Sequence, residues 1–395
     1  MAGFESFDVV IVGGGVIGSS IAFFLAEEPD FAGSIAVIER DPTYVDSSTA
    51  RSVGGIRQQF STPENIEIAK FGAAFFKTAG ERLAVGEERP DLAFCESGYL
   101  LLASRDGRAI LQQNHALQVA HGAAVTLLEP AALEQRFPWL RTEDLVGGSL
   151  GLRDEGWIDP YSLLMAFKRK AESLGVVYLQ QEVVALPRRG ARVTGVQLRD
   201  GARLACGSVV DAAGPGAAKV AALAGIEDCP VRPRKRLVFT FECREPMPDC
   251  PLVVDPCGLY FRPEGDKFLC GASPPPDQDP DSRDLKVDPH YFEEMLWPAL
   301  AHRVPAFDAL REGTAWAGHY AVNVLDHNAI LGPHPEVENF YFANGFSGHG
   351  LQQAPAVGRA LAETIASGTY RTLDLNRFGF SRFATGRLIE ERNVI

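Results

Sequence analysis

The feature that most constrains the fold is a glycine-rich turn near the start of the chain. Residues 7–12 form a short apolar run, the length of a buried parallel strand, and lead into Gly13-Gly14-Gly15-Val16-Ile17-Gly18. This turn has the spacing G-x-G-x-x-G, and apolar residues at helical spacing follow it. A second apolar strand, residues 35–38, ends on Glu39. The order of strand, turn, helix, strand and acid predicts a dinucleotide-binding site.

Each residue of this motif has a physical role at such a site. Gly13 allows a sharp turn, Gly15 lets a pyrophosphate approach the backbone, and Gly18 lets the helix pack closely on the strand. The helix N-terminus offers unpaired N–H groups and a partial positive charge to the phosphates. Glu39 lies 39 − 18 = 21 positions after the last glycine, where a ribose-binding carboxylate is expected. A glycine-rich turn without a ligand is the alternative.

Length and charge limit the other classes of function. A chain of 395 residues is too long for one ordinary core, so we expect two domains. The formal net charge of −13 argues against nucleic acid and against an anionic membrane surface as partners. No apolar run approaches the roughly 20 residues that span a bilayer. The first strand begins within a few residues of Met1, which predicts a cytoplasmic protein, or a mitochondrial-matrix protein if a leader was removed.

The seven cysteines predict neither disulfides nor a metal site. They include no C-x-x-C pair, and no histidine pair at zinc-like spacing accompanies them. We therefore expect free thiols in a reducing compartment. The basic run at residues 234–236 is interpreted as a solvated strand edge.

A second glycine-rich turn lies more than 300 residues after the first. The apolar strand at residues 339–344 leads into Gly345-Phe346-Ser347-Gly348-His349-Gly350, and a helix is expected from about residue 351 to residue 367. A domain that binds only a nicotinamide cofactor has no use for this second unit. A flavin does, because a helix N-terminus stabilises the negative charge of the reduced ring. The two turns therefore favour FAD over NAD.

The segments between the two turns support this interpretation. The loop at residues 41–61 is rich in serine, threonine and glycine, which suits a backbone packed on phosphates or a flat ring, although a surface loop is the alternative. Asp159 and Pro160 have the order of an N-cap and a first helical residue. We expect helices at residues 63–82, 106–122, 130–137, 160–174 and 288–304.

Five stretches are typical of one family. They are residues 8–18, the Ser47-Ser48-Thr49 loop, the strand at residues 209–214, Trp316-Ala317-Gly318, and the turn at residues 345–350. They resemble the D-amino-acid oxidase superfamily, and the glycine oxidase, sarcosine oxidase and dimethylglycine dehydrogenase branch is nearest. The resemblance implies an α/β plus α+β fold, in which a Rossmann-like FAD-binding domain is interleaved with a mainly antiparallel substrate domain. The FAD domain would contain residues 1–85, 145–225 and 318–395, and the substrate domain residues 86–144 and 226–317.

The resemblance also implies amine oxidation. A C–H beside nitrogen would pass as hydride to flavin N5, and water would hydrolyse the imine. We expect a small secondary or N-substituted amino acid as substrate, with oxygen or another redox partner as acceptor, and homo-oligomer formation stays open. Residues 52–60, 154–157, 303–307 and 350–355 resemble a mitochondrial FAD-dependent oxidoreductase-domain group linked to respiratory complex I assembly. That likeness implies the alternative, a flavin-containing assembly or scaffold protein with little turnover.

The cofactor is expected to be FAD, held noncovalently. Gly318 and Arg51 stand near the positions where relatives tether the flavin through a cysteine or a histidine, and Gln352 replaces a lysine that helps sarcosine oxidases react with oxygen. The predicted cofactor-binding residues are Gly13, Gly15, Val16, Ile17, Gly18, Glu39, Arg40, Ser47, Ser48, Thr49, Arg51, Ser52, Val53, Gly54, Val183, Val184, Ala213, Gly214, Gly318, Gly345, Phe346, Ser347, Gly348, His349, Gly350, Leu351 and Gln352.

Five residues are candidates for contact with the substrate. Arg57 aligns with a carboxylate-binding arginine of sarcosine oxidases, and a guanidinium group forks well onto a carboxylate. Its alternative role is a loop salt bridge, and Arg262 is the alternative anchor. Tyr260 and Tyr320 could orient or deprotonate the amine, or could simply be packed core tyrosines. His319 is a candidate base, or else a structural histidine.

Overall fold

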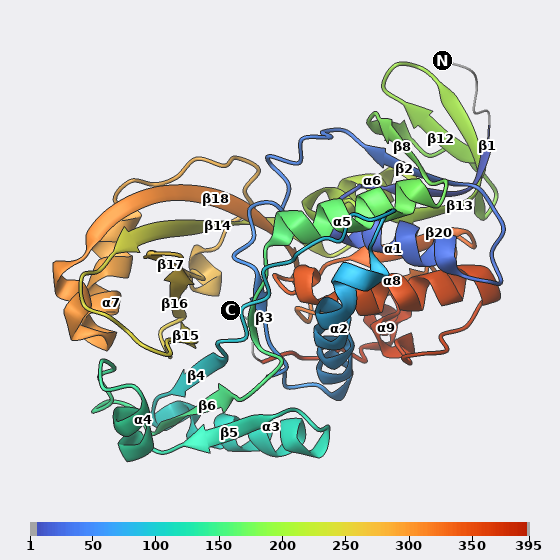
Figure 1. Ribbon diagram of the computed structural model, residues 1–395. Helices are drawn as coiled ribbons and strands as arrows, with labels where there is room; N and C mark the ends of the chain where they lie inside the picture. Colours follow the sequence, from blue (N-terminus) through green and yellow to red (C-terminus); the bar gives the residue numbers. More distant parts are fainter. Residues whose placement is uncertain (1–5, 393–395) are drawn as a thin grey trace.

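The computed structural model describes residues 6–392, which form two eight-stranded sheets with helices packed against them (Figure 1). In the first sheet, five parallel strands lie in the order β20 (Phe340–Asn344), β13 (Arg203–Asp211), β1 (Ser6–Val12), β2 (Ile35–Glu39) and β8 (Val177–Gln180). Antiparallel β19 (Ile330–Pro333) pairs with β20 at one edge. The strands β9 (Val183–Ala185) and β12 (Gly195–Leu198) complete this sheet next to β13.

Helices from both ends of the chain cover the first sheet. On one side lie α1 (Val16–Glu27), α2 (Pro63–Arg82), α5 (Pro160–Ser173) and α8 (Gly350–Ser367), which share one apolar core with strands of the sheet. The helices α1 and α8 run side by side (Figure 1), and the Ser20 hydroxyl donates a 2.7 Å hydrogen bond to the Ala354 carbonyl. A Cβ at Gly358 would lie 2.2 Å from the Ser20 hydroxyl oxygen. On the other face, α6 (Ala217–Leu223) packs into a second core.

The second sheet is mainly antiparallel. Its strands, in spatial order, are β18 (Arg311–Asn323), β14 (Val231–Glu242), β17 (Lys267–Ala272), β16 (Leu259–Glu264), β15 (Leu252–Val254), β4 (Tyr99–Ala103), β6 (Gly147–Gly151) and β5 (Val125–Leu128). Only the pair β15 and β4 is parallel among the neighbours in this order. One side carries an aromatic core that includes Phe241, Phe261 and Phe307. The opposite side carries Tyr99 and Tyr260.

The remaining short strands and α-helices lie outside the two eight-stranded sheets. They are β3 (Gly55–Ile56), β7 (Gly156–Trp157), β10 (Arg188–Arg189), β11 (Arg192–Val193), α3 (Arg108–Ala120), α4 (Pro130–Arg136), α7 (Trp297–Arg303) and α9 (Ser381–Thr385). The pairing of β3 with β7 joins the loop after β2 to the turn after β6. The predicted fold class, a Rossmann-like domain interleaved with an antiparallel-sheet domain, is confirmed.

The predicted helices agree with the structure except in one place. The helix predicted at residues 63–82 is α2, and the Asp159 carboxylate accepts a 2.6 Å hydrogen bond from the Ser162 backbone as the cap of α5. The helix predicted at residues 288–304 is instead a π-helical turn, Phe292–Leu296, followed by α7. The second residue of α7 is Pro298, which has no N–H for a regular hydrogen bond to the preceding turn.

The domain limits stay a prediction, but two strands lie differently from what the limits imply. The strand β6 pairs with β4 and β5 of the second sheet, although the limit at residue 145 assigns it to the FAD domain. The strand β18 crosses the limit at residue 318 and pairs with β14 along almost its whole length.

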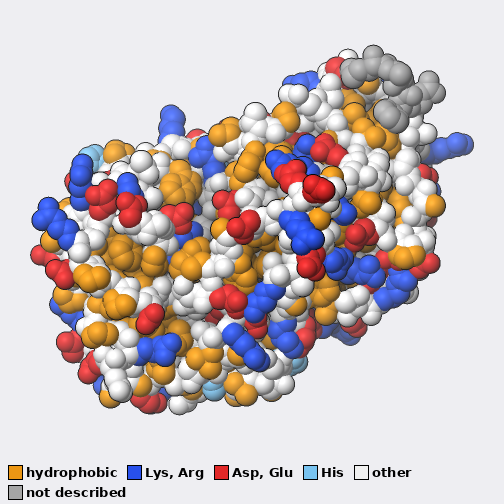
Figure 2. All heavy atoms as spheres, viewed as in Figure 1, with side chains coloured by type: hydrophobic (Ala, Val, Ile, Leu, Met, Phe, Trp, Pro, Cys, Tyr) orange, Lys and Arg blue, Asp and Glu red, His pale blue; other side chains and the backbone are white. Residues whose placement is uncertain are grey.

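Three further observations concern the whole described chain. Between residues 6 and 392, no helix is both long and apolar enough to cross a membrane. All seven cysteines are free, and the described residues contain no group of histidine, cysteine and acidic side chains that could hold a metal ion. On the face shown in Figure 2, acidic and basic side chains are interspersed and neither sign forms a large patch.

Candidate active site

The two glycine-rich turns lie at the same edge of the first sheet. Gly13 follows β1 and Gly345 follows β20, and only β13 separates these two parallel strands. Carboxyl ends of parallel strands meet at one edge, which is where ligands bind in sheets of this kind. The helices that leave the turns, α1 and α8, have no side-chain hydrogen bond at their N-caps. Two helix N-termini therefore face one region of the molecule.

The first turn has the close approaches that its glycines predict. Gly13 has φ of +103°, and a Cβ at this position would lie 2.5 Å from the Ala212 carbonyl oxygen. A Cβ at Gly18 would lie 1.9 Å from the Gly13 carbonyl oxygen. The Glu39 carboxylate accepts a 2.8 Å hydrogen bond from the Gly14 backbone, so it is held beside the turn at the end of β2.

The polar loop after β2 packs onto this turn. The Thr49 hydroxyl accepts a 3.2 Å hydrogen bond from the backbone of Val16, the first residue of α1. The Ser48 hydroxyl is buried and has no hydrogen-bond partner among the described residues. Arg51 donates to the Ala317 carbonyl at 2.9 Å and pairs with Asp46 at 2.7 Å. An unpartnered hydroxyl group in the loop that packs on the first glycine-rich turn fits a polar ligand such as a phosphate or ribose.

The second turn is fixed against β18. Gly345, Ser347 and Gly348 have φ of +72°, +51° and +97°. The Ser347 backbone donates to the Ala321 carbonyl at 2.9 Å, and a Cβ at Gly348 would lie 2.5 Å from the ring of Tyr320. The turn thus presents the N-terminus of α8 to the second sheet with little freedom to move.

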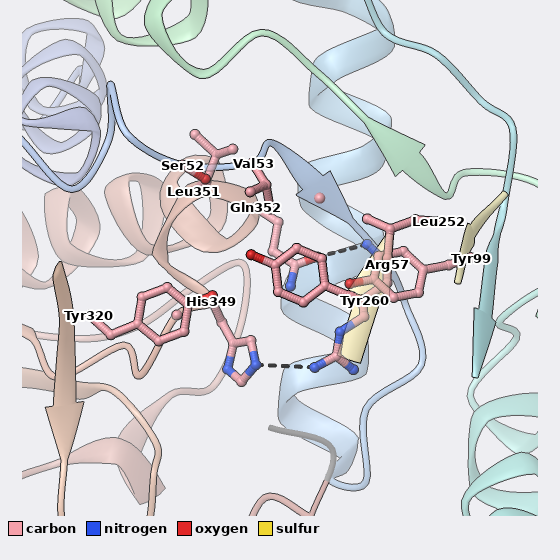
Figure 3. Close-up of a pocket in the computed structure, with 12 residues that line it drawn as sticks. Ser52, Val53, Arg57, Tyr99, Leu252, Tyr260, Tyr320, His349, Leu351 and Gln352 are labelled. Carbon is pink, nitrogen blue, oxygen red and sulfur yellow. Dashed lines mark hydrogen bonds between the residues drawn. The ribbon is translucent and has the colours of Figure 1, made fainter. Parts of the chain in front are cut away.

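A cavity lies between this turn and the second sheet (Figure 3). The space between its lining atoms is about 530 Å³, part of which is open to solvent. Its lining residues are Ser52, Val53, Gly55, Arg57, Tyr99, Leu252, Tyr260, Tyr320, Gly348, His349, Leu351 and Gln352. Three predicted substrate contacts, Arg57, Tyr260 and Tyr320, are therefore brought together here.

Arg57 is the cationic residue of this cavity, and its side chain is buried. One guanidinium nitrogen lies 3.1 Å from His349 Nε2, as the dashed line in Figure 3 shows. Another donates to the Gln59 carbonyl, and the guanidinium lies 4.2 Å from the centre of the Phe60 ring. The Arg57 backbone donates to the Gln352 side chain at 2.8 Å. Arg57 is thus held by the loop after β3 and by α8 together.

His349 is neutral in this arrangement. Burial and the positive charge of Arg57 keep the pKa of His349 well below its usual value of about 6.5. Because an arginine can only donate, Nε2 of His349 is the acceptor in their contact. His349 therefore orients Arg57, in addition to its predicted place in the flavin turn.

The three tyrosines of the cavity are protonated. Burial raises the pKa of Tyr99, Tyr260 and Tyr320 above the usual value of about 10. A tyrosine that stays protonated has no free phenolate to accept a proton, so of the two predicted roles for Tyr260 and Tyr320 orientation is more compatible with the structure than deprotonation. Tyr99 was not predicted, since nothing in the run at residues 98–103 distinguishes it from a packed strand residue.

Two predicted residues do not line the cavity. Arg262 donates to the Val53 carbonyl at 2.7 Å, pairs with Glu264, and lies 4.8 Å from the centre of the Trp157 ring. His319 precedes Tyr320 in β18, so its side chain leaves the opposite face of the sheet. Of the two arginines predicted as anchors, only Arg57 therefore lines the cavity, and the His319 side chain does not reach it.

Two further residues near the cavity were missed or misread. Glu155 is buried beneath it and binds the segment after Arg57; its only signal in the sequence is the run at residues 154–157. Arg236 is not a solvated strand edge, because its side chain is only 12% exposed. It forms a bidentate pair with Asp279, both contacts at 2.8 Å, and lies 5.1 Å from the centre of the Tyr320 ring.

The outer predicted cofactor contacts lie in different surroundings. Ala213 and Gly214 follow β13 directly beside the first turn, and Val183 is buried in β9. Val184 and Arg40 are exposed. A Cβ at Gly318 would lie 3.2 Å from Cβ of Arg51, so these two residues pack on each other. Contact of each of these residues with FAD stays a prediction.

Comparison with known families decides the class of protein. The family profile described as "FAD dependent oxidoreductase" matches residues 8–364. The chain belongs to this family. FAD is therefore its cofactor, as predicted, and the two turns, Ser48 and Glu39 are the residues that fit it. Gly318 and Arg51 are neither cysteine nor histidine, in keeping with the prediction of a noncovalent cofactor.

Individual relatives agree with this assignment. The chain is 44% identical over 425 residues to "FAD-dependent oxidoreductase domain-containing protein 1" of Xenopus laevis, covering 99% of this chain and 85% of that protein. It is 26% identical over 403 residues to "Sarcosine oxidase subunit beta" of Rhizobium meliloti, covering 98% and 90%. Among solved structures, L-proline dehydrogenase from P. horikoshii matches with a TM-score of 0.86 and 28% identity, covering 98% of this chain and 100% of that one. Glycine oxidase from Geobacillus kaustophilus shares the fold, with a TM-score of 0.81 at 24% identity over 96% and 99%.

Proposed function

We propose that this FAD-dependent oxidoreductase oxidises the carbon beside the nitrogen of a small amino acid, preferably one with a secondary or N-substituted amine. The observation that carries the proposal is the cavity itself. It brings one buried arginine, Arg57, and three tyrosines to the N-terminus of α8. The names of two relatives, a sarcosine oxidase subunit and an L-proline dehydrogenase, support a secondary amine.

The residues that line the cavity have two roles, binding of the substrate and exclusion of water. Arg57 binds the substrate carboxylate, because a guanidinium group and a carboxylate form strong charge-assisted hydrogen bonds. Tyr99, Tyr260 and Tyr320 pack on the rest of the substrate and keep water from it. With FAD bound, the N-terminus of α8 would stabilise negative charge on the reduced ring. When bound, FAD supplies the electron acceptor for the C–H bond beside nitrogen.

The lining residues also indicate the protonation state of the substrate. The tyrosines stay protonated, and His349 Nε2 accepts from Arg57, so no strong base lines the described cavity. The amine must therefore bind in its neutral form, and the rate depends on positioning rather than on proton abstraction.

An anaerobic amine panel tests the proposal. The purified flavoprotein is mixed with sarcosine, other N-methyl amino acids, iminodiacetate and D-amino acids, and the flavin absorption band is followed. Bleaching by a secondary amino acid is the expected result. The same panel with oxygen and with an artificial dye then distinguishes an oxidase from a dehydrogenase.

The alternative is a flavin-containing assembly or scaffold protein with little turnover. It is favoured by the higher identity to domain-containing proteins, 44%, than to the named oxidase and dehydrogenase relatives, 28% or less. A yellow protein that no amine bleaches would support this alternative and contradict amine oxidation.

A further inference from the structure

Glu155 is a buried acid that neither lines the cavity nor serves the cofactor turns. It lies between β6 and β7 and is 1% exposed. Its two carboxylate oxygens accept hydrogen bonds from the Gln58 backbone at 2.6 Å and from the Gln59 side chain at 2.8 Å. A Cβ at Gly151 would lie 1.9 Å from a Glu155 oxygen, so β6 leaves the carboxylate no room to move.

The two partners of Glu155 directly follow Arg57. The carbonyl of Gln59 accepts a hydrogen bond from the Arg57 guanidinium. The Gln59 side chain also donates to the Tyr99 carbonyl at 2.9 Å. The Arg57 guanidinium thus connects to Glu155 through a single residue, Gln59, on one side, and contacts His349, the residue before α8, on the other. The orientation of the guanidinium depends on both supports.

The chemistry of Glu155 suits this position better than a neutral residue would. An ionised carboxylate offers two acceptors to two donors, whereas a glutamine would turn its own N–H₂ group toward one of them. Its negative charge also favours the buried positive charge of Arg57. A carboxylate buried here costs desolvation, and burial raises the pKa of Glu155 to about 7.

We propose that Glu155 is a positioning residue that fixes Arg57 through Gln58 and Gln59 in the orientation needed to bind the substrate carboxylate. The proposal rests on the proposed role of Arg57 as the anchor. In this proposal the β6–β7 turn supports the site for the substrate carboxylate. The two glycine-rich turns form the separate site for the flavin.

The test measures carboxylate binding separately from turnover. Methylthioacetate carries a carboxylate and has sulfur in place of the reacting nitrogen, so its binding to the FAD-loaded protein can be followed by the change in flavin absorption. At pH 8, Glu155→Gln should raise its Kd at least tenfold. With an N-methyl amino acid that bleaches the flavin, KM should rise similarly while kcat changes less than threefold.

Two further variants keep the test independent of folding defects. Gln59→Ala removes the side chain that binds Glu155 but leaves Glu155 itself in place. It should reproduce the rise in the Kd for methylthioacetate. Glu96→Gln is the matched control, because Glu96 lies in the neighbouring segment and binds Lys77 and the Asp154 backbone at the surface. Its Kd should stay at the wild-type value.

Each other outcome has a defined meaning. A Glu155→Gln protein with unchanged Kd overturns the proposal, as does an equal loss of kcat and flavin content without a change in Kd. A wild-type protein that does not bind methylthioacetate refutes both the anchor and its support. If the wild type binds methylthioacetate but no amine bleaches the flavin, amine oxidation fails, and the shift in Kd still decides the role of Glu155.

Discussion

Substrate affinity is expected to depend on Arg57. Replacement by alanine removes the charge-assisted hydrogen bonds to a carboxylate, so KM for a carboxylated amine should rise by the equivalent of about 2 kcal/mol or more, roughly thirtyfold. Arg311→Ala is the control, because Arg311 lies in β18 with its side chain 85% exposed. Steady-state kinetics of the three proteins, with one substrate, checks the prediction. An unchanged KM in Arg57→Ala would remove Arg57 from this role.

Glu155 should make stability depend on pH. Burial raises the pKa of Glu155 from 4.5 to about 7, so the folded state holds this proton more tightly than the unfolded state. The stabilisation is complete below about pH 4.5 and is lost as the pH rises through 7. Between pH 4.5 and pH 8 the free energy of unfolding of the wild type should therefore fall by about 3 kcal/mol more than that of Glu155→Gln.

Urea unfolding of the FAD-loaded proteins at the two pH values measures this difference. Burial also raises the pKa of Asp211, to about 8, but Asp211 is present in both proteins and its contribution cancels. Parallel curves for the two proteins would show that Glu155 keeps an ordinary pKa.

At the residue scale, the sequence predicted those site residues that belong to a recognisable short motif. The glycines of the two turns were predictable because each belongs to a run with a recognisable order, and Arg57 was singled out by the family resemblance. Tyr99 and Glu155 were not, because their proximity to Arg57 arises only when β4 and the β6–β7 turn pack against the loop after β3. Arg236 was misread because strand alternation places it on the opposite face from its neighbour Lys235, which is 29% exposed.

At the element scale, the turn before α8 should be sensitive to a single methyl group. Gly348→Ala places a Cβ 2.5 Å from the rigid Tyr320 ring, in a backbone conformation with φ of +97°. We expect FAD affinity to fall at least tenfold, because the turn must shift to relieve the contact. Fluorescence titration of the apoprotein with FAD measures the change.

Gly175→Ala provides a matched control for backbone strain. Gly175 has φ of +95°, and no atom lies within 4 Å of a Cβ built on it. Its substitution should lower stability by about 1 kcal/mol through the left-handed backbone alone and leave FAD affinity unchanged. Equal losses of affinity in the two variants would assign the effect to strain, and the close approach of the turn to Tyr320 would then be unimportant.

A helix whose sequence marks its first residue was predictable. A helix that changes its hydrogen-bond pattern ahead of an internal proline was not. Pro63 marked the start of α2, and the extent of the apolar pattern that follows gave its end at Arg82. The π-helical turn at Phe292–Leu296 has the same apolar periodicity as an α-helix over so short a length, and only Pro298 marks the change.

At the scale of the whole molecule, the carboxyl-terminal segment fastens the start of α2. The Glu391 carboxylate is buried and accepts hydrogen bonds from the Ser61 backbone at 2.8 Å, the Ser61 hydroxyl at 2.7 Å and the Asn65 side chain at 3.0 Å. Glu391→Ala leaves these donors without their acceptor, so the free energy of unfolding should fall by about 3 kcal/mol.

The neighbouring residue provides the control for this prediction. Glu390 is exposed, and Glu390→Ala should change stability by less than about 0.5 kcal/mol. Chemical unfolding of both variants checks the difference. Similar stabilities would mean that the carboxyl-terminal segment only lies against α2 without holding it.

The interleaved architecture was predictable, because two cofactor turns far apart in the chain must meet at one ligand. The membership of single strands was not. Whether β6 or the second half of β18 joins one sheet or the other is decided by partner strands distant in the sequence, and the same apolar residues would suit either sheet.

The position of β20 in the first sheet has a consequence for biosynthesis. It lies beside β13, and both it and the turn that follows come from residues after 339 of 395. A nascent chain on the ribosome therefore contains the first glycine-rich turn more than 300 residues before it contains the second. We expect stable capture of the flavin only once β20 and the turn after it have been made, so chains truncated before this strand should be colourless.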